Sequence, residues 1–512
     1  MRDPADSLRF ILGLKLRSLR LRRGMSLKDV AERARLSISY LSEIEKGKKY
    51  PKPEKLLDLA AALEVGYDEL VSQRVSGELV PLTDLFGSAY LQEFPFELFG
   101  TAAPELVSSI GDEPGRVAAL LGTFAEVGHR YDIDLGELLL AALRSYQHLH
   151  HNHFPELEEA AVEFRREHGW SARTRLGPQR LAAVLEQEHG YEIDLETLQD
   201  HSELSGFRSV YAEGAVPRLF LNGRLLPEQQ SFLLARELGY RALGLEERAI
   251  TSTWIQVTSF EQILNNFRAS YFAGALLIDR EALIHRLERL FAERRWNQKA
   301  FLDCMVQARS TPEMFFHRLS EVLPSAFGME ELYFIRFSRA DPGGGAPGIF
   351  RLSKMLNLSK IPLPQGEGLG EHFCRRWGAL RILDTLAADP PHRADQPIVA
   401  SRRTRFLGYD QEFFVVSMAR PLALDSDLLS SVTLGIRIDD AFRRRVRFAD
   451  DPTIPREEVG FTCERCPLTP EQCRERVAPP LLLNERRDQA ALAAAVDRFV
   501  RDRRAEPSAS RV

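Results

Sequence analysis

Apolar residues near the N-terminus recur at the spacing of short helices. In residues 10–23 they lie three or four positions apart, on one helix face, and Gly24 ends that segment. Ser26 and Ser37 stand where the N-caps of two further short helices belong, and a fourth helix follows to about Leu63. The pattern therefore predicts four short helices packed around one small core.

The middle of the chain combines helical spacing with one clear alternating segment. Residues 71–152 contain an apolar helical stripe and predict a helical connector. Residues 219–222 alternate between apolar and polar positions, which predicts a strand. A helix with a buried apolar face follows that strand and ends near Leu243.

The C-terminal part is rich in segments of strand-like composition that Gly and Pro separate. They read "LYFIRF", "IFRLSKML", "EFFVVSMARPL" and "SSVTLGIRI". We expect an antiparallel sheet with helices, broadly GAF-like or PAS-like, of the kind that encloses small molecules. Residues 485–504 predict an amphipathic helix with Leu492, Val496 and Val500 facing inward.

Composition and charge narrow the class of protein. The 512 residues carry a formal net charge of -5, but residues 1–75 hold 16 Lys and Arg against 11 Asp and Glu. A basic first segment on an acidic chain indicates polyanion binding confined to that segment. No long uncharged apolar run and no secretory signal pattern are present, so we expect a cytoplasmic protein.

The two helices that begin near Ser26 and Ser37 have the spacing of a DNA-reading unit. Two short helices joined by a tight turn place the second one in the major groove of duplex DNA. Ser39, Tyr40 and Glu43 then face the bases, and lysines at the end of that helix lie near phosphates. The candidate DNA-binding residues are Ser26, Lys28, Ser37, Ser39, Tyr40, Glu43, Lys46, Lys48 and Lys49.

The segment "SLKDVAERARLSISYLSEIEKGKKYP" resembles the lambda-repressor-like, or XRE, helix-turn-helix family. It departs from the family at Leu27, where Gln is usual. The resemblance implies binding to double-stranded operator DNA as a homodimer or a dimer of dimers. The alternative is a small helical bundle that serves protein contacts.

The middle segment "RLFLNGRLLPEQQSFLLARELGYRAL" resembles the ImmA/IrrE-type metallopeptidase domain. In that family a strand precedes a helix with the zinc motif H-E-x-x-H. Here Arg236 and Tyr240 replace both histidines around Glu237, and Asn266 stands near the place of the third ligand. We expect a degenerate domain with no metal site and no enzyme activity. A repressor-cleaving metallopeptidase that takes its ligands from elsewhere is the alternative.

Clustered histidines and cysteines are candidate metal ligands. His148, His150, His151 and His153 point in different directions on a helix, so a solvated or packed helix end is favoured over a metal site. Cys463, Cys466 and Cys473 have the spacing C-x2-C-x6-C, and Cys374 completes a set of four thiols for a [4Fe-4S] cluster or a structural zinc. Cys304 stands alone and predicts packing.

The segments "PEMFFHRLSEVLPSAFGMEELYFIRF", "EHFCRRW" and "GFTCERCPLTPEQCRERVAPP" resemble the short-chain fatty acyl regulators, the ScfR group. The resemblance implies a transcription regulator of propionate, acetate and glyoxylate-bypass metabolism that senses short-chain acyl-CoA in its C-terminal region. It also implies a [4Fe-4S] cluster on the four cysteines. An iron-sulfur redox sensor without an acyl ligand is the alternative.

Basic residues next to Cys374 are candidates for contact with the acyl-CoA. Arg375, Arg376 and Arg381 would neutralise the phosphates, and Trp377 would cover the adenine or the pantetheine arm. The competing interpretation is that the arginines form surface ion pairs and that Trp377 fills the core.

The chain is thus expected to be a multidomain α+β protein. The expected parts are a helix-turn-helix domain at 1–72, a helical connector at 73–155, a degenerate ImmA/IrrE-like domain at 156–285, an acyl-CoA sensor with the cysteines at 286–481, and a helix and tail at 482–512.

Overall fold

The computed structural model divides into two compact units, one of 1–146 with 256–263 and one of 147–255 with 264–512. Lys46, Lys48 and most of the expected connector lie outside the described residues. The residues that the structure describes are 4–45, 49–71, 95, 98, 135–251, 259–340, 348–363, 370–388 and 393–505.

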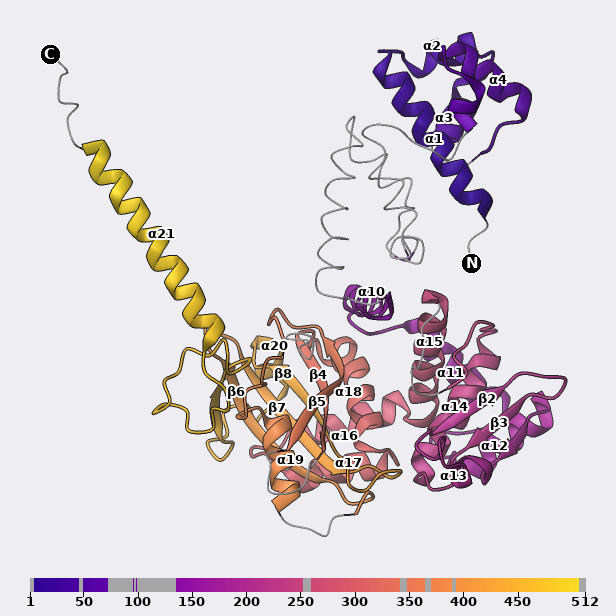
Figure 1. Cartoon of the computed structure of the whole chain (residues 1–512). Helices are drawn as coiled ribbons and strands as arrows, with labels where there is room; N and C mark the ends of the chain where they lie inside the picture. The colour runs from indigo at the N-terminus through magenta and orange to yellow at the C-terminus, as the bar shows by residue number, and fades with distance from the viewer. Residues whose placement is uncertain are drawn as a thin grey trace. The chain divides into compact units, whose positions relative to one another are not determined.

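The N-terminal helices match the sequence prediction (Figure 1). They are α1 (Pro4–Arg22), α2 (Leu27–Arg33), α3 (Ile38–Glu45), α4 (Pro53–Ala62) and the short α5 (Tyr67–Val71). Their apolar faces meet in one core that includes Leu16, Val30, Leu41 and Leu59. Each of these four side chains is at most 1% exposed, so burial of these periodic positions holds the bundle together.

The middle of the chain forms a small α/β body. The strand and helix predicted around residues 219–243 are present as β3 and α14, and Leu233, Leu234 and Leu238 of α14 are buried as expected. β3 lies between β1, which is parallel to it, and β2, which is antiparallel. Its elements are α11 (Pro155–Glu167), α12 (Pro178–His189), β1 (Glu192–Asp194), α13 (Thr197–Asp200), β2 (Ser209–Ala212), β3 (Arg218–Leu221), α14 (Pro227–Ala242) and most of α15 (Phe260–Leu277). Helix α10 (Leu135–Leu149) precedes them in the chain and falls mostly in the first unit.

The C-terminal part contains a six-stranded sheet with the order β5-β4-β8-β7-β6-β9. Neighbouring strands are antiparallel, as predicted, except that β9 runs parallel to β6. The elements are α16 (Arg280–Phe291), α17 (Gln298–Gln307), α18 (Pro312–Phe327), β4 (Leu332–Ala340), β5 (Ile349–Asn357), α19 (Gly378–Ala388), β6 (Ile398–Phe406), β7 (Glu412–Pro421), β8 (Leu429–Arg437), α20 (Asp440–Arg445), β9 (Arg456–Val459) and α21 (Leu481–Ala505).

Helices cover both faces of this sheet (Figure 1). Successive side chains on a strand point to opposite faces of the sheet. Phe334, Val416 and Leu434 point to one face and pack under α16, α17 and α18. Their neighbours Tyr333, Val415 and Phe413 face α19 on the other side. Cys304 lies in the first of these cores, where packing was expected for it.

The C-terminal helix α21 is exposed, contrary to the prediction of an inward apolar face. Leu492 is 69% exposed and Val496 is 55% exposed, while the side chain of Val500 lies outside the described residues. The amphipathic pattern was correct for a helix, but no described part of this chain covers its apolar positions. Among the described helices, none combines the length and the apolar character needed to cross a membrane.

Candidate nucleic-acid interface and buried polar sites

The turn between α2 and α3 is fixed by local hydrogen bonds. Ser26 caps α2 in a capping box: its Oγ accepts from Asp29 N at 3.2 Å, and Ser26 N donates to Asp29 Oδ2 at 2.7 Å. Ser37 Oγ accepts from Tyr40 N at 3.1 Å at the start of α3. Arg35 between them has a φ of 51°, a left-handed conformation that reverses the chain. Both serines therefore act as helix caps, the role that the sequence indicated.

Helix α1 holds α3 through a close backbone contact and a buried ion pair. A Cβ on Gly13 would lie 2.5 Å from the carbonyl oxygen of Ile44, so only glycine permits this approach. Arg20 donates from Nε and Nη2 to the two carboxylate oxygens of Glu45 at 2.7 and 2.8 Å, and from Nη1 to Met25 O at 3.1 Å. No motif marked these residues in the sequence; a glycine inside a helical pattern was the available signal.

The first turns of α3 present a polar, accessible surface. Ser39 is exposed, and Tyr40 and Glu43 are half-buried. The Lys49 ammonium lies 2.8 Å from Glu43 Oε2 and 5.7 Å from the centre of the Tyr40 ring. Lys28 on α2 is also exposed and lies 3.9 Å from Glu32. The structure thus brings the described candidate residues together on α2, α3 and the segment after α3.

Two of the residues at the positions of the expected metallopeptidase ligands, Tyr240 and Asn266, meet in the fold, and Arg236 lies near Glu237. Tyr240 Oη lies 3.5 Å from Asn266 Oδ1, and Arg236 Nη2 lies 3.8 Å from Glu237 Oε1. Glu237 is fully buried, and Arg248 donates from Nη2 to both of its carboxylate oxygens at 2.7 and 2.6 Å. An arginine thus supplies the positive charge at this glutamate.

Two tyrosine rings surround the Arg248 guanidinium. Its central carbon lies 3.6 Å from the ring centre of Tyr211 and 4.4 Å from that of Tyr240. Burial opposes its charge, but the Glu237 carboxylate holds the pKa of Arg248 above its usual value. No motif marked Arg248 in the sequence, because the contact depends on the path of the chain after α14.

The fold brings Cys374 next to the loop of the other three cysteines. Cys374 N donates to Phe461 O at 3.0 Å, and Cys463 N donates to His372 O at 2.8 Å. Cys374, Cys463, Cys466 and Cys473 are all buried and none forms a disulfide. Burial raises the pKa of the Cys374 thiol to about 11, with a smaller contribution from Cys466 and Cys463.

Arg476 organises this cysteine loop. Its Nη1 donates to Cys463 O at 2.9 Å and its Nη2 donates to Cys466 O at 3.1 Å. Within the part of the chain that the structure describes, no three His, Cys, Asp or Glu side chains stand close enough to hold a metal ion as they are. The same holds for the clustered histidines His148, His150, His151 and His153. His151 there lies 3.9 Å from Glu330, and burial lowers the pKa of His153.

The predicted acyl-CoA contacts have protein partners. Trp377 is 4% exposed, lies in the sheet core, and donates from Nε1 to Gly460 O at 2.7 Å. Arg381 donates to Glu457 and Glu475 at 2.9 and 2.8 Å. These are the contacts that the competing interpretation describes.

The two arginines before Trp377 differ in their surroundings. Arg376 donates to Gln472 O at 2.6 Å and to Glu475 Oε2 at 3.2 Å. Arg375 lies with its guanidinium 4.2 Å from the ring centre of Phe350. Arg376 therefore connects the segment before α19 to the cysteine loop, whereas the Arg375 guanidinium stacks on Phe350 of β5.

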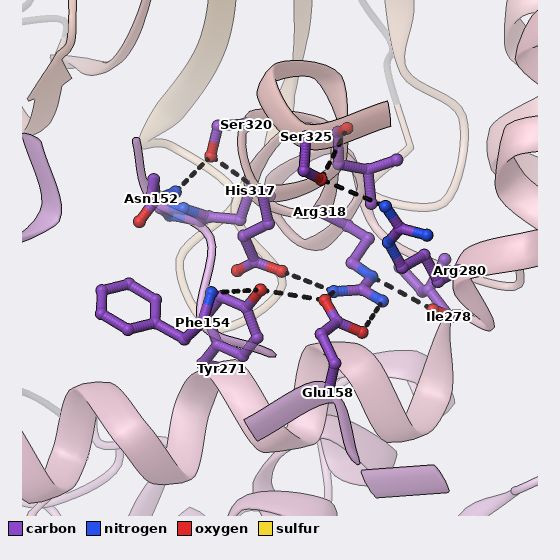
Figure 2. A network of polar contacts seen from close by, with 12 residues as sticks. Asn152, Phe154, Glu158, Tyr271, Ile278, Arg280, His317, Arg318, Ser320 and Ser325 are labelled. Carbon is purple, nitrogen blue, oxygen red and sulfur yellow. Dashed lines mark hydrogen bonds and ion pairs between the residues drawn. The ribbon is translucent and has the colours of Figure 1, made fainter. Parts of the chain in front are cut away.

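An ionic network joins helices α11 and α15 of the α/β body to helix α18 of the C-terminal part (Figure 2). Arg318 on α18 donates to Glu158 on α11 from Nη1 and Nη2, at 2.6 and 2.8 Å, and to Glu321 Oε2 at 3.0 Å. Its Nε donates to Ile278 O at 3.1 Å, and Tyr271 Oη donates to Glu158 Oε1 at 2.9 Å. One guanidinium thus serves the half-buried Glu158 and the buried Glu321.

The two carboxyl groups differ in protonation. Burial raises the pKa of Glu321 to about 8. Burial acts on Glu158 in the same direction, but its hydrogen bonds from Arg318 hold its pKa below the usual value. Glu158 is therefore the ionised partner, and Glu321 stays protonated at neutral pH, so that the network is close to neutral.

Comparisons with known proteins agree with the first two parts of the fold. A helix-turn-helix domain model matches residues 11–72, and an IrrE N-terminal-like domain model matches residues 188–320. The transcriptional regulator ClgR of Mycobacterium tuberculosis is 41% identical over 61 residues, 12% of this chain and 54% of that protein. The HTH-type transcriptional regulator DdrOP3 of Deinococcus deserti is 40% identical over 57 residues, 11% of this chain and 44% of that protein.

The chain thus spans about half the length of the curated relatives that it matches. A solved structure described as a Mycobacterium tuberculosis transcriptional regulator aligns with 66% of this chain and 92% of its own, at 18% identity and a TM-score of 0.44. The chain is a multidomain protein with an N-terminal helix-turn-helix domain, an IrrE N-terminal-like domain and a C-terminal region built on a sheet.

Proposed function

We propose that this chain is a transcriptional regulator that binds duplex DNA through α2 and α3. The observation that carries the proposal is the capped α2–α3 pair, which leaves Ser39 and Tyr40 accessible at the start of the second helix. The relatives that match this segment are transcriptional regulators. Such modules read two half-sites as dimers, so the proposed species on DNA is a homodimer.

Fluorescence anisotropy with a labelled duplex from the chain's own promoter region tests this proposal. The variant Tyr40→Ala removes a ring that the proposal places at the DNA, and Lys49→Gln removes a charge near the phosphates. Each is expected to weaken binding by about tenfold, within the range for one good contact. The control Lys299→Gln changes a lysine that is 85% exposed on α17 and leaves affinity unchanged. Equal affinity of all three variants would support a helical bundle for protein contacts instead.

The proposed effector is a short-chain acyl-CoA bound in the C-terminal region. The proposal rests on the resemblance to the short-chain fatty acyl regulators and on a sheet with helices on both faces, a common setting for small-ligand sites. Calorimetric titration of anaerobically purified protein with propionyl-CoA and acetyl-CoA tests it. Binding of either thioester, with a change in operator affinity, is expected. Absence of heat together with a redox-dependent operator affinity would favour the iron-sulfur sensor without an acyl ligand.

Cys374, Cys463, Cys466 and Cys473 are the proposed ligands of a [4Fe-4S] cluster. Their chemistry suits this group, because all four are buried thiols without a disulfide and the segments of Cys374 and Cys463 are hydrogen-bonded to each other, but no three of these side chains lie at metal-binding distance in the described structure. A bound cluster would supply a site whose oxidation state and integrity respond to redox conditions. Iron and sulfide analysis of anaerobic protein is expected to find the cluster in the wild type and not in Cys463→Ser. A colourless protein that holds zinc would favour the structural zinc.

We also propose that the IrrE N-terminal-like domain has no peptidase activity. Arg236 and Tyr240 cannot replace the two histidine ligands, and Glu237 is held by Arg248. A general base must be within reach of a water and free to accept a proton, but this carboxylate is fully buried and ion-paired. Zinc-dependent cleavage of a purified repressor substrate by the full chain would contradict this.

A further inference from the structure

Helix α21 carries apolar residues that no described part of the chain covers. It is one continuous helix, Leu481–Ala505 (Figure 1). Every residue at 484–498 is exposed, with Leu492 at 69% and Val496 at 55%. Residues 490–496 are all Ala, Leu or Val, so nearly two turns of this helix have no polar side chain. A helix that is apolar on all sides is normally buried.

The start of α21 is fixed to the cysteine loop. Leu483 N donates to Glu464 O at 3.1 Å, and Glu464 lies between Cys463 and Cys466 in the chain. Leu482 and Leu483 are half-buried, and exposure begins at the next residue. The helix is therefore anchored at one end, and the rest of its described length is open to a partner.

One face of α21 combines its two larger exposed apolar residues with a charge at each end. Leu492 and Val496 are four positions apart and so are neighbours on this face. Glu485 lies seven positions before Leu492, two turns earlier on the same face. Position 503, an arginine, lies 18 residues after Glu485, which is five full turns, so it shares the face as well.

This face is complementary to itself about Ala494. Leu492 stands two positions before Ala494 and Val496 two positions after it, while Glu485 and Arg503 stand nine positions before and after. In an antiparallel pair with a two-fold axis at this level, Leu492 lies opposite Val496 of the partner subunit. The same register sets Glu485 opposite Arg503 of the partner subunit, and each contact occurs twice.

A parallel pair lacks this complementarity. It would set Glu485 against Glu485 of the partner subunit, and Arg503 against Arg503 of the partner subunit. Like charges at facing positions are destabilising. The small side chains of Ala493 and Ala495 flank the apolar stripe and permit close approach of a second helix in either orientation, so the charges decide between the two.

We propose that α21 pairs with the α21 of a second copy of this chain, in antiparallel orientation. The partner is a second copy because a two-fold contact needs one patch that complements itself, and this face does so in both charge and position. Exposed apolar patches of folded proteins mark contacts with other molecules. The pairing does not depend on DNA binding, but it would join the two chains of the homodimer proposed above.

Sedimentation equilibrium of the full chain without DNA tests the inference. The wild type is expected to be in a monomer–dimer equilibrium. Leu492→Asp puts a charge into the apolar contact twice and is expected to weaken association at least about tenfold. Arg487→Glu changes an exposed charge two positions after Glu485, on the far side of the helix, and is the matched control that associates as the wild type.

An exchange of charges tests the orientation. Glu485→Arg sets two arginines against each other at both ends of the antiparallel pair and is expected to weaken association about fivefold. The double variant Glu485→Arg with Arg503→Glu restores opposite charges and is expected to associate within about twofold of the wild type. In a parallel pair like charges would face each other in all three proteins, so neither variant would differ from the wild type.

The outcomes separate this contact from other partners of α21. A dimer that is insensitive to Leu492→Asp, or no recovery in the double charge variant, overturns the inference. A monomeric wild type whose thermal midpoint falls in Leu492→Asp would show that another segment of the same chain covers the helix, which also overturns it. Circular dichroism of each variant checks that its helix content is unchanged. Salt-dependent DNA binding by a chain that stays monomeric would remove the α21 contact and leave the proposed DNA binding in place.

Discussion

Arg318→Met is the substitution with the most clearly defined physical consequence in this structure. The arginine is 1% exposed and makes its hydrogen bonds to Glu158, Glu321 and Ile278 O. Methionine fills a similar length of space but leaves the Glu158 carboxylate without its counter-ion. Removing one partner of a buried ion pair costs about 3–5 kcal/mol, because a desolvated charge stays behind.

The midpoint of the thermal transition that includes α11 and α18 is expected to fall by roughly 10 °C, because each kcal/mol of lost stability lowers it by a few degrees. Circular dichroism and calorimetry of the full chain measure it. The control is the double variant Arg318→Met with Glu158→Gln, which removes both charges and keeps an oxygen for the Tyr271 hydroxyl. It is expected to recover most of the lost stability. A midpoint for Arg318→Met within about 2 °C of the wild type would refute the claim that this network is buried and ionic.

Three further substitutions follow from the same contacts. Glu321→Gln removes one source of the pH dependence of stability. Because the pKa of Glu321 is near 8 in the folded state and lower in the unfolded state, the free energy of unfolding of the wild type falls as pH rises from 4.5 to 8. Denaturant unfolding across that range is expected to show no such fall from this position in the variant. Arg248→Met leaves the buried Glu237 with only its longer contact to Arg236, at 3.8 Å, and is expected to cost up to about 3–5 kcal/mol, with recovery when Glu237→Gln is added. Equal stability of the single variant and the wild type contradicts the pairing. Gly13→Ala forces α1 away from α3 and is expected to cost about 1–3 kcal/mol in thermal unfolding and to weaken DNA binding, whereas an unchanged midpoint would show that the two helices are not in close contact.

Local sequence signals were sufficient for the N-terminal helices. Ser26 and Ser37 mark helix starts by a hydrogen bond to a residue three positions later, so their role is visible within one helical turn. The strand and helix around Glu237 were found in the same way. The spacing grouped Cys463, Cys466 and Cys473, whereas Cys374 was added as a fourth thiol from metal chemistry and from the family resemblance. The fold places the segment of Cys374 beside that of Cys463.

Long-range charge contacts were not visible in the sequence. Arg318 and Glu158 are separated by 160 residues, and nothing in either neighbourhood predicts the other. Arg248 lies in a segment without helix or strand after α14, so no helical or strand spacing relates it to Glu237 and their ion pair could not be predicted. The exposure of Leu492 on α21 shows the opposite error, because an apolar stripe predicts a buried face only where the chain provides a partner.

The salt dependence of DNA binding by the full chain tests the central claim most directly. Anisotropy titrations with the promoter duplex, between 50 and 200 mM salt, measure how many phosphates the protein neutralises. Binding through α2 and α3 predicts an affinity that falls by about a hundredfold or more over that range, and that Tyr40→Ala weakens at each salt concentration. No measurable affinity for the duplex, or an affinity that does not change with salt, would contradict the account.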